Sequence, residues 1–144
     1  MKPFWQTKPF QVRWNEPLGK PECPYAFRWV FIFFGYSIRV HKWIRSDDKR
    51  HMHDHGWNFR TFILKGYYHD ISELNGKIIK EPIVFTAYRK AEHKHYVEVP
   101  EDGCWTLLFC SKPFRKWGFW VDGKIFKRPL KYFHKWGHPI CSEQ

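Results

Sequence analysis

The stretch HMHDHGWNFRTFILKGYYHDI, residues 51–71, decides the fold, because two closely spaced histidines run directly into an aromatic and aliphatic strand that ends at Gly66. Side chains two positions apart lie on one face of a β-strand, so His53 and His55 could bind the same metal ion. A second strand-like run carries His95, and a sheet rolled into a barrel would return that histidine to the first pair. We therefore predict one divalent metal ion bound by His53, His55 and His95.

Two more histidines share the spacing of the predicted ligands. His51 falls on the same strand face as the first pair, and His93 repeats that parity beside His95, so both are candidate additional ligands. Asp54 takes the opposite face, and we expect it to make a hydrogen bond outside the set of ligands. The competing interpretation is that some of the nine histidines cluster by chance, or that residues 51–55 form a polar loop.

Length and composition indicate one folded domain. The chain has 144 residues, of which 43% are hydrophobic and 21% aromatic, so it can bury a substantial core and is not a disordered basic tail. Its formal net charge of +11 would attract anionic metabolites, nucleotides or polyanions. The same charge has a simpler interpretation, since lysine and arginine stems can cover apolar surface and keep an aromatic protein soluble.

The cysteines and the apolar segments indicate a cytoplasmic protein. No CxxC pair occurs among the four scattered cysteines, so we expect reduced, buried thiols and neither a zinc ribbon nor a redox site. The N-terminal residues lack a continuous apolar segment, and the run at residues 29–34 is far shorter than the roughly 20 residues of a membrane-spanning helix. These features predict no membrane association.

The chain divides into a proline-rich beginning and a β-rich body. Residues 1–26 hold five prolines, which lack a backbone donor and fix φ, so we predict an extended arm that packs on the body through Phe4, Trp5, Phe10 and Trp14. The body, residues 27–144, is predicted to be a single barrel domain.

Aromatic and β-branched residues between turn signals predict the strands of that body. The expected strands are residues 27–34, 36–44, 57–64, 67–71, 78–83, 95–99, 104–110, 117–121 and 124–127. The first two of these are either separate strands or one strand bent at Gly35. Asn75 and Gly76 give a strong hairpin signal. Residues 130–139, LKYFHKWGHP, form either a short helix that ends at Gly137 or an irregular aromatic cap. We predict an all-β closed barrel or jelly roll, the architectures that hide sheet edges.

The histidine motif resembles the first signature of the cupin superfamily. In that signature a histidine pair is followed by a glutamate and then a glycine, and here Phe59 and Gly66 follow His53 and His55 at those intervals. His95 matches the histidine of the second signature. Two departures stand out: Phe59 replaces the glutamate, and the proline and glycine that usually precede the second histidine are missing.

Several blocks, HDHGWNFRTFILKGYYHD, AEHKHYVEV, CWTLLFC and KWGFW, are similar to small single-domain cupin-like proteins, many of them encoded by phages or prophages. The resemblance covers roughly residues 40 to 125. It implies a cupin β-barrel, also called a double-stranded β-helix, with an inward-facing metal that is commonly iron, manganese, zinc or nickel. Cupins include dioxygenases, isomerases, decarboxylases and proteins that only bind ligands.

Five residues are predicted to line a ligand pocket beside the metal: Trp57, Arg60, Tyr68, Arg89 and Trp105. A guanidinium with a phenol suits a phosphate or carboxylate, and Trp57 shares the strand parity of His53 and His55. By the same parity Arg60 points away from His55 unless a bulge intervenes, and a surface ion pair is the simpler role for it.

The function that these features favour is a metal-dependent enzyme of the oxygenase or isomerase class, acting on an anionic or nucleotide-like substrate. The alternative is a binding protein that sequesters a nucleotide or other anionic ligand without turnover. A third hypothesis, a nucleic-acid-binding accessory protein, rests on the basic and aromatic stretch SKPFRKWGFW at residues 111–120. No serine-nucleophile or phosphate-loop motif is present, and the sequence leaves a homo-oligomer open.

Overall fold

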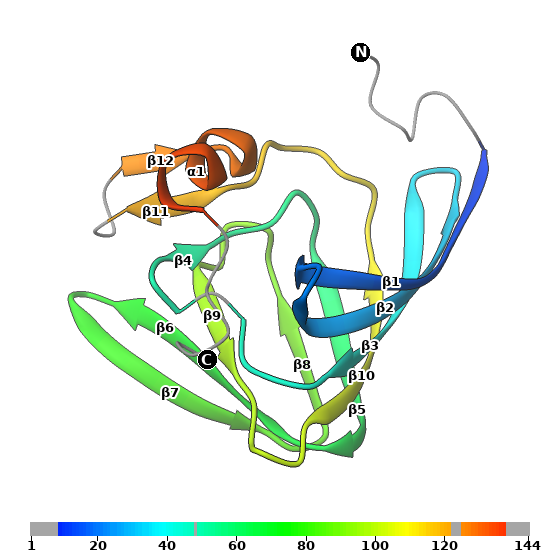
Figure 1. The fold of residues 1–144 in the computed structure, drawn as a ribbon, viewed down its shortest axis with the longest axis horizontal. Coiled ribbons are helices and arrows are strands. Elements are labelled where there is room, and N and C mark those ends of the chain that lie inside the picture. Colours follow the sequence, from blue (N-terminus) through cyan, green and yellow to red (C-terminus); the bar gives the residue numbers. More distant parts are fainter. Residues whose placement is uncertain (1–8, 48, 122–124, 138–144) are drawn as a thin grey trace.

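The computed structural model describes residues 9–47, 49–121 and 125–137, which form two six-stranded antiparallel sheets facing each other as a jelly roll (Figure 1). Sheet A has the order β1-β2-β3-β10-β5-β8, and sheet B has the order β12-β11-β4-β9-β6-β7. The strands are β1 (Phe10–Lys20), β2 (Cys23–Phe33), β3 (Tyr36–Trp43), β4 (Met52–His53), β5 (Phe59–Gly66), β6 (Tyr68–Leu74), β7 (Lys77–Ile83), β8 (Thr86–Arg89), β9 (His95–Glu98), β10 (Cys104–Cys110), β11 (Phe119–Val121) and β12 (Ile125–Lys127). The predicted all-β jelly roll is confirmed.

Strand β10 shows how the alternation of the sequence builds sheet A. It pairs with β3 on one side and with β5 on the other along its whole length. Cys104, Thr106 and Cys110 are buried, whereas Phe109 is exposed on the outer face. This period-two pattern places every second side chain of a central strand in the space between the sheets.

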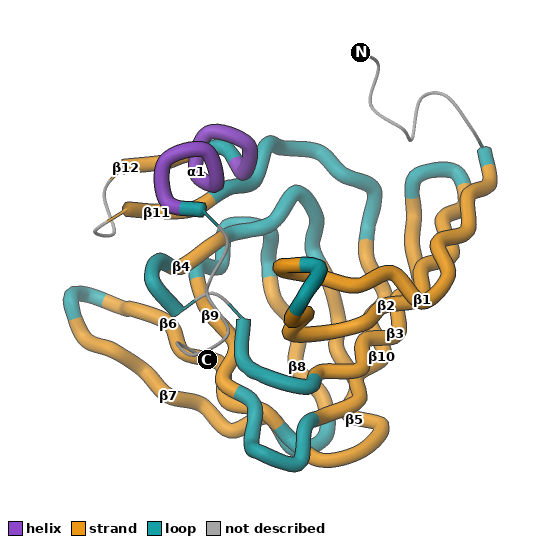
Figure 2. The backbone as a smooth tube through the Cα atoms, in the orientation of Figure 1, coloured by secondary structure: helices purple, strands orange, loops and turns teal. Residues whose placement is uncertain are grey.

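Tight turns connect neighbouring strands where the sequence predicted them. Asn75 and Gly76 join β6 to β7 with φ values of 52° and 79°, the left-handed conformation of a two-residue hairpin. Phe34 and Gly35 join β2 to β3 in the same way. Figure 2 shows the longer loop from β10 to β11 crossing between the sheets beside the helix.

The proline-rich beginning differs from the predicted arm. From Phe10 it is the edge strand β1, which pairs with β2 through residues Phe10 to Lys20. Its Leu18 contributes to the wall of the internal cavity, so this segment is part of the barrel. Phe4 and Trp5, expected to anchor an arm, lie outside the described residues.

The space between the sheets has an apolar end and a polar region. At the apolar end Tyr68, Ile83, Ala87, Val97 and Cys104 pack into one cluster. Elsewhere the inward positions of β3, β6 and β9 carry histidine, arginine and aspartate side chains that are also buried. Burying polar groups costs free energy, so their concentration in one region marks that region as the candidate site.

The chain folds back over sheet B as a short helix, α1 (Pro129–Trp136), with Pro129 in its first turn and Gly137 after its end. The Tyr132 ring stacks on Phe119 of β11, with 3.9 Å between the ring centroids. Of the two forms predicted for this segment, the structure has the helix. No helix in the described ranges is long and apolar enough to cross a membrane.

The cysteines differ in part from the expectation of reduced thiols. Cys104 and Cys110 are free and buried in β10, and burial raises the pKa of Cys104 to about 11, which makes it an inert thiol. Cys23, in contrast, is disulfide-bonded.

Candidate metal centre

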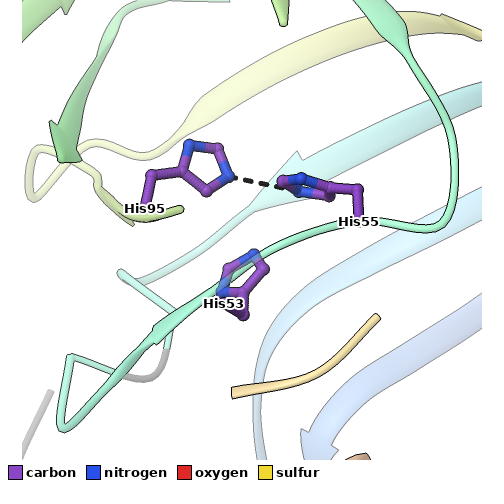
Figure 3. A group of neighbouring side chains, drawn as sticks. All are labelled: His53, His55 and His95. Carbon is purple, nitrogen blue, oxygen red and sulfur yellow. Dashed lines mark hydrogen bonds between the residues drawn. The ribbon is translucent and has the colours of Figure 1, made fainter. Parts of the chain in front are cut away.

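Strand β4 aligns the first of the predicted ligands with the third. It has only two residues, and its His53 lies directly opposite His95 of β9 in the antiparallel register. His55 follows the end of β4 and is held by a hydrogen bond from its backbone N–H to the Ala91 carbonyl, at 2.9 Å. Three imidazoles from two separate stretches of sequence thereby converge between the sheets (Figure 3).

The spacing of these three rings fits a single metal ion. Their ring centroids lie 4.9 to 5.2 Å apart, and each ring offers one nitrogen that lies within 4.8 Å of the other two. Nε2 of His55 is 3.2 Å from Nε2 of His95. Two nitrogens bound to one ion at about 2.1 Å and about 90–109° apart would be separated by about 3.0–3.4 Å, so this pair already has the separation of shared ligands.

Asp70 on β6 sets the orientation of His95. Its carboxylate accepts a hydrogen bond from Nδ1 of His95 at 2.8 Å and another from Nε2 of His93 at 3.0 Å, and Arg89 pairs with it at 3.1 Å. Burial alone would raise the pKa of Asp70, but the hydrogen bonds from His93 and His95 outweigh it and hold that pKa well below its usual range. An ionised carboxylate only accepts, so His95 carries its proton on Nδ1 and turns the lone pair of Nε2 toward His55.

Burial keeps the three imidazoles neutral. It lowers the pKa of His53 to about 3 and the pKa of His55 well below its ordinary value. Burial also lowers the pKa of His95, although the hydrogen bond to Asp70 opposes that change. Neutral imidazole is the form that binds a metal, so all three side chains are ready as ligands at neutral pH.

Two further observations fit a metal ion at this point. Nδ1 of His55 is buried and has no hydrogen-bond partner among the described residues. The ring of Phe59 lies 4.7 Å from the His55 ring, so the position of the usual cupin glutamate faces the cluster but offers no ligand atom. The residues present therefore fit a site of three neutral nitrogens.

The histidines form one wall of a cavity of about 170 Å³ between the sheets. Trp57 and Tyr68, two of the five predicted pocket residues, line this cavity. Burial raises the pKa of Tyr68, so its phenol, which lies within hydrogen-bonding reach of Thr61, stays protonated. Its lining side chains also include Arg28, Arg39, His41, Asp47, Thr61 and Thr106.

The other predicted pocket residues lie elsewhere. Arg60 is exposed on the outer face of sheet A, where its guanidinium packs on Tyr88, as strand parity indicated. Arg89 is bound by Asp70 and Glu81 and is absent from the cavity wall. Trp105 stacks on Trp29 outside the cavity, because its neighbours Cys104 and Thr106 take the inward positions of β10.

The two additional histidines do not join the three-histidine group. Nδ1 of His51 is 2.9 Å from the hydroxyl of Tyr132 in α1. Strand β4 begins only at Met52, so the alternation of faces along a strand does not apply to His51. His93 donates from Nε2 to Asp70, and with Asp70 and His95 it forms a second group whose ligand atoms lie close enough together to hold a metal ion.

Asp54 has the role outside the ligand set that its strand parity predicted. It is fully buried and accepts hydrogen bonds from the Gly118 backbone, from Trp120 and from Arg115. These bonds tie the loop before β11 to the histidine segment. Part of the basic and aromatic stretch 111–120 thus makes contacts within the fold. Fewer of its side chains are therefore available to bind nucleic acid.

Sequence reasoning missed three buried polar residues of this region, Arg39, His41 and Asp70. Arg39 and His41 alternate with apolar residues along β3 at positions that share one face with Ser37. A polar face on a strand rich in aromatic and β-branched residues was the available signal for them. Asp70 gave no such signal, because its importance depends on the pairing of β6 with β9.

A scan against protein-family models and a search of curated protein sequences gave no match. In structure the chain is similar to Fe(II)-HppE with the alternative substrate (S)-1-HPP, with a TM-score of 0.53 and 9% identity over 71% of this chain and 56% of that one. It is also similar to the hydroxypropylphosphonic acid epoxidase from S. wedmorenis, with a TM-score of 0.51 and 10% identity over 70% and 59% of the two chains.

A third similar structure is the W96Y variant of oxalate decarboxylase from Bacillus subtilis, with a TM-score of 0.52 and 12% identity over 82% of this chain and 30% of that one. The chain spans less than two thirds of the length of each of these proteins. At such low identity the likeness concerns the fold, and these neighbours are cupin-fold proteins. Together with the two facing sheets and the histidine cluster between them, it shows that this chain has the fold of the cupin superfamily.

Proposed function

We propose that the protein is a metal-dependent enzyme for a small anionic molecule, with one divalent ion bound by His53, His55 and His95. The observation that carries this proposal is the convergence of three neutral imidazoles, each offering a nitrogen within 4.8 Å of the others, on the wall of an internal cavity. A surface cluster would offer no room for a substrate, whereas this one does.

The charge of the site supports an anionic substrate. Three neutral ligands would leave the full positive charge of a divalent ion in the cavity, and Arg39, which has no carboxylate partner among the described residues, lines the same cavity. The bound ion would supply Lewis acidity, and iron would add the capacity to activate oxygen. The protonated phenol of Tyr68 would donate a hydrogen bond to an oxygen of the substrate.

The size of the cavity supports a small substrate. Its volume of about 170 Å³ is below the roughly 300–1,000 Å³ of pockets that hold drug-sized ligands. A nucleotide-like substrate fits this volume less well than a short organic acid. The reaction class we propose remains an oxygenase or an isomerase, and the metal present would separate the two, because iron favours the oxygenase.

Elemental analysis of protein purified without added metal tests the proposal. We expect about one equivalent of iron, manganese, zinc or nickel per chain in the native protein. A variant with both His53→Ala and His95→Ala should lose it, and the matched control His69→Ala should keep it, because His69 lies on β6 outside the cavity. A native protein that binds none of these ions, even after each has been supplied, would contradict the proposal.

The same preparation tests the alternative functions. A tightly bound organic anion released on denaturation, without turnover of related compounds, would favour the sequestering protein. Tight binding of short oligonucleotides that weakens steeply with salt would favour the nucleic-acid hypothesis, which the structural neighbours do not support. A homo-oligomer and a cytoplasmic location remain predictions of the sequence.

A further inference from the structure

Arg39 of β3 is a buried cation on the wall of the metal cavity. Only 7% of it is exposed, and it lines the same space as the three histidines. Its Nε donates a hydrogen bond to the Ser37 hydroxyl at 3.0 Å, and its guanidinium carbon lies 4.2 Å from the centre of the Trp57 ring. The guanidinium also lies within hydrogen-bonding reach of the Cys110 thiol. A guanidinium has five N–H donors, so these partners do not use all of them.

No carboxylate neutralises Arg39 within the described residues. The acidic side chain whose charge reaches it, Glu16, accepts a hydrogen bond from Nε of Arg28 at 3.0 Å and pairs with Arg13 at 3.5 Å. Asp54, on the cavity wall, is held by Arg115 and Gly118.

Asp47, the other aspartate of the cavity wall, accepts a hydrogen bond from the Val97 backbone at 2.8 Å and faces Nδ1 of His53 at 3.9 Å. Burial lowers the pKa of Arg39 to about 10, which still leaves it charged at neutral pH. An arginine buried without a counter-charge is costly unless a ligand supplies one.

His41, two residues further along β3, faces the same cavity with unused hydrogen-bonding capacity. Both of its ring nitrogens are buried, and neither has a partner among the described residues. Burial lowers its pKa to about 3, helped by the charge of Arg39, so the ring is neutral at pH 7 and offers one donor and one acceptor. Both ring nitrogens of His41 and the guanidinium of Arg39, which has no carboxylate partner among the described residues, therefore line the same space.

We propose that Arg39 and His41 bind the anionic group of the substrate, and that this substrate is a small organic oxyanion, a carboxylate or a phosphonate. A guanidinium binds either group through two parallel hydrogen bonds. The cavity volume limits the remainder of the molecule to a short chain. This inference rests on the proposed function in one respect, since it places the other end of the substrate toward the histidine cluster.

Calorimetric titration of the metal-loaded and the metal-free protein with acetate, oxalate and methylphosphonate tests the proposal. We expect Arg39→Gln to weaken binding of the preferred anion about tenfold or more, in both forms of the protein. Arg39→Lys should recover part of the loss, because it restores the charge but not the two-pronged geometry. The matched control Arg60→Gln removes an exposed arginine of the same sheet and should bind like the native protein. The stronger of acetate and methylphosphonate identifies the oxyanion.

A second variant separates binding from a merely structural role. Arg39 is buried without a carboxylate partner. In the absence of added anion, the melting temperature of Arg39→Met should therefore equal or exceed that of the native protein. It should also lose the increase in melting temperature that the preferred anion gives to the native protein. Loss of stability in Arg39→Met with an unchanged response to anions would overturn the proposal.

The failure of this proposal is distinguishable from failure of the metal site. If His53→Ala with His95→Ala loses the metal while Arg39→Gln and Arg60→Gln both bind anions like the native protein, the anion site is wrong and the metal site stands. If the native protein binds no metal but its anion binding depends on Arg39, the proposed anion site is supported and the proposed metal site is wrong. Failure of the native, metal-loaded protein to bind any of the three anions at millimolar concentration would also overturn it.

Discussion

The aromatic ring of Phe59 packs against the imidazole of His55, with 4.7 Å between their centres, at the position where the cupin signature usually has a glutamate. Phe59 is the first residue of β5 and is 4% exposed, so it faces the cavity. The phenylalanine therefore leaves the three histidines without a carboxylate at this position.

Restoring the glutamate should strengthen metal binding. In Phe59→Glu the new carboxylate would lie beside the histidine cluster, and we expect roughly tenfold tighter binding of manganese or iron at pH 7.5, measured by competition with a chelator. Without metal the same variant should be less stable by about 2 kcal/mol, because it buries an unpaired charge. Phe62→Glu, on the outward face of the same strand, is the control and should leave metal affinity unchanged. Equal affinity in the two variants would show that residue 59 does not face the ion.

Asp70 should control metal affinity without being a ligand. Asp70→Asn removes the carboxylate that fixes the proton of His95 on Nδ1, and loss of such a partner typically weakens metal binding about 10- to 100-fold. Glu81→Gln is the matched control, since Glu81 binds the same Arg89 but is exposed. Affinity in Asp70→Asn equal to that of the control would contradict the role given to Asp70.

His41 should make the protein sensitive to acid. Its pKa is about 3 in the folded protein and about 6.5 in the unfolded chain, so the unfolded state takes up a proton first as the pH falls. The contribution of His41 to the free energy of unfolding is therefore fully present above pH 6.5. It declines by about 1.4 kcal/mol per pH unit down to about pH 3.

Urea denaturation at pH 7.5 and pH 5.5 checks this contribution. Between these two pH values His41→Phe should lose about 1.4 kcal/mol less stability than the native protein. His134→Gln, on the exposed surface of α1, should behave like the native protein. An identical loss in His41→Phe and in the native protein would mean that His41 is solvated in the folded state.

Gly66 should tolerate alanine less well than Gly76 does. Both glycines have φ near +80°, where a Cβ costs about 1–2 kcal/mol. A Cβ on Gly66 would also lie 2.9 Å from the Gly103 carbonyl oxygen, whereas a Cβ on Gly76 would meet nothing within 4 Å. We expect Gly66→Ala to lose at least about 1 kcal/mol more stability than Gly76→Ala in urea denaturation. Equal losses would show that the backbone at Gly103 moves aside.

Local patterns were enough to predict most of the fold. The strand β10 follows directly from the alternation of CWTLLFC, and the β6–β7 hairpin follows from Asn75 and Gly76, because both signals depend only on neighbouring residues. The N-terminal strand β1 was missed because Pro17 reads as a strand breaker. At the edge of sheet A, however, a proline is tolerated, since an edge strand leaves half of its backbone groups outside the ladder.

The site was predictable only where its residues lie close in sequence or match a signature. His53, His55 and His95 came from spacing, whereas Asp70 became visible only once β6 was paired with β9. Arg60 and Arg89 were predicted to bind an anion because they flank the histidine segment, whereas the arginines of the cavity wall are Arg28 and Arg39, on the strands before it. Such placement depends on sheet register, which one sequence does not reveal.

The two-residue strand β4 has a consequence for protein synthesis. His53 meets His95 through this single pair of residues, so the cluster does not exist in a nascent chain that ends before residue 95. A ribosome must release both strands before an ion can be captured by all three rings. Loading of an ion at the proposed site would therefore follow translation of most of the barrel, and protein made in metal-depleted medium should take up its ion when the metal is supplied afterwards.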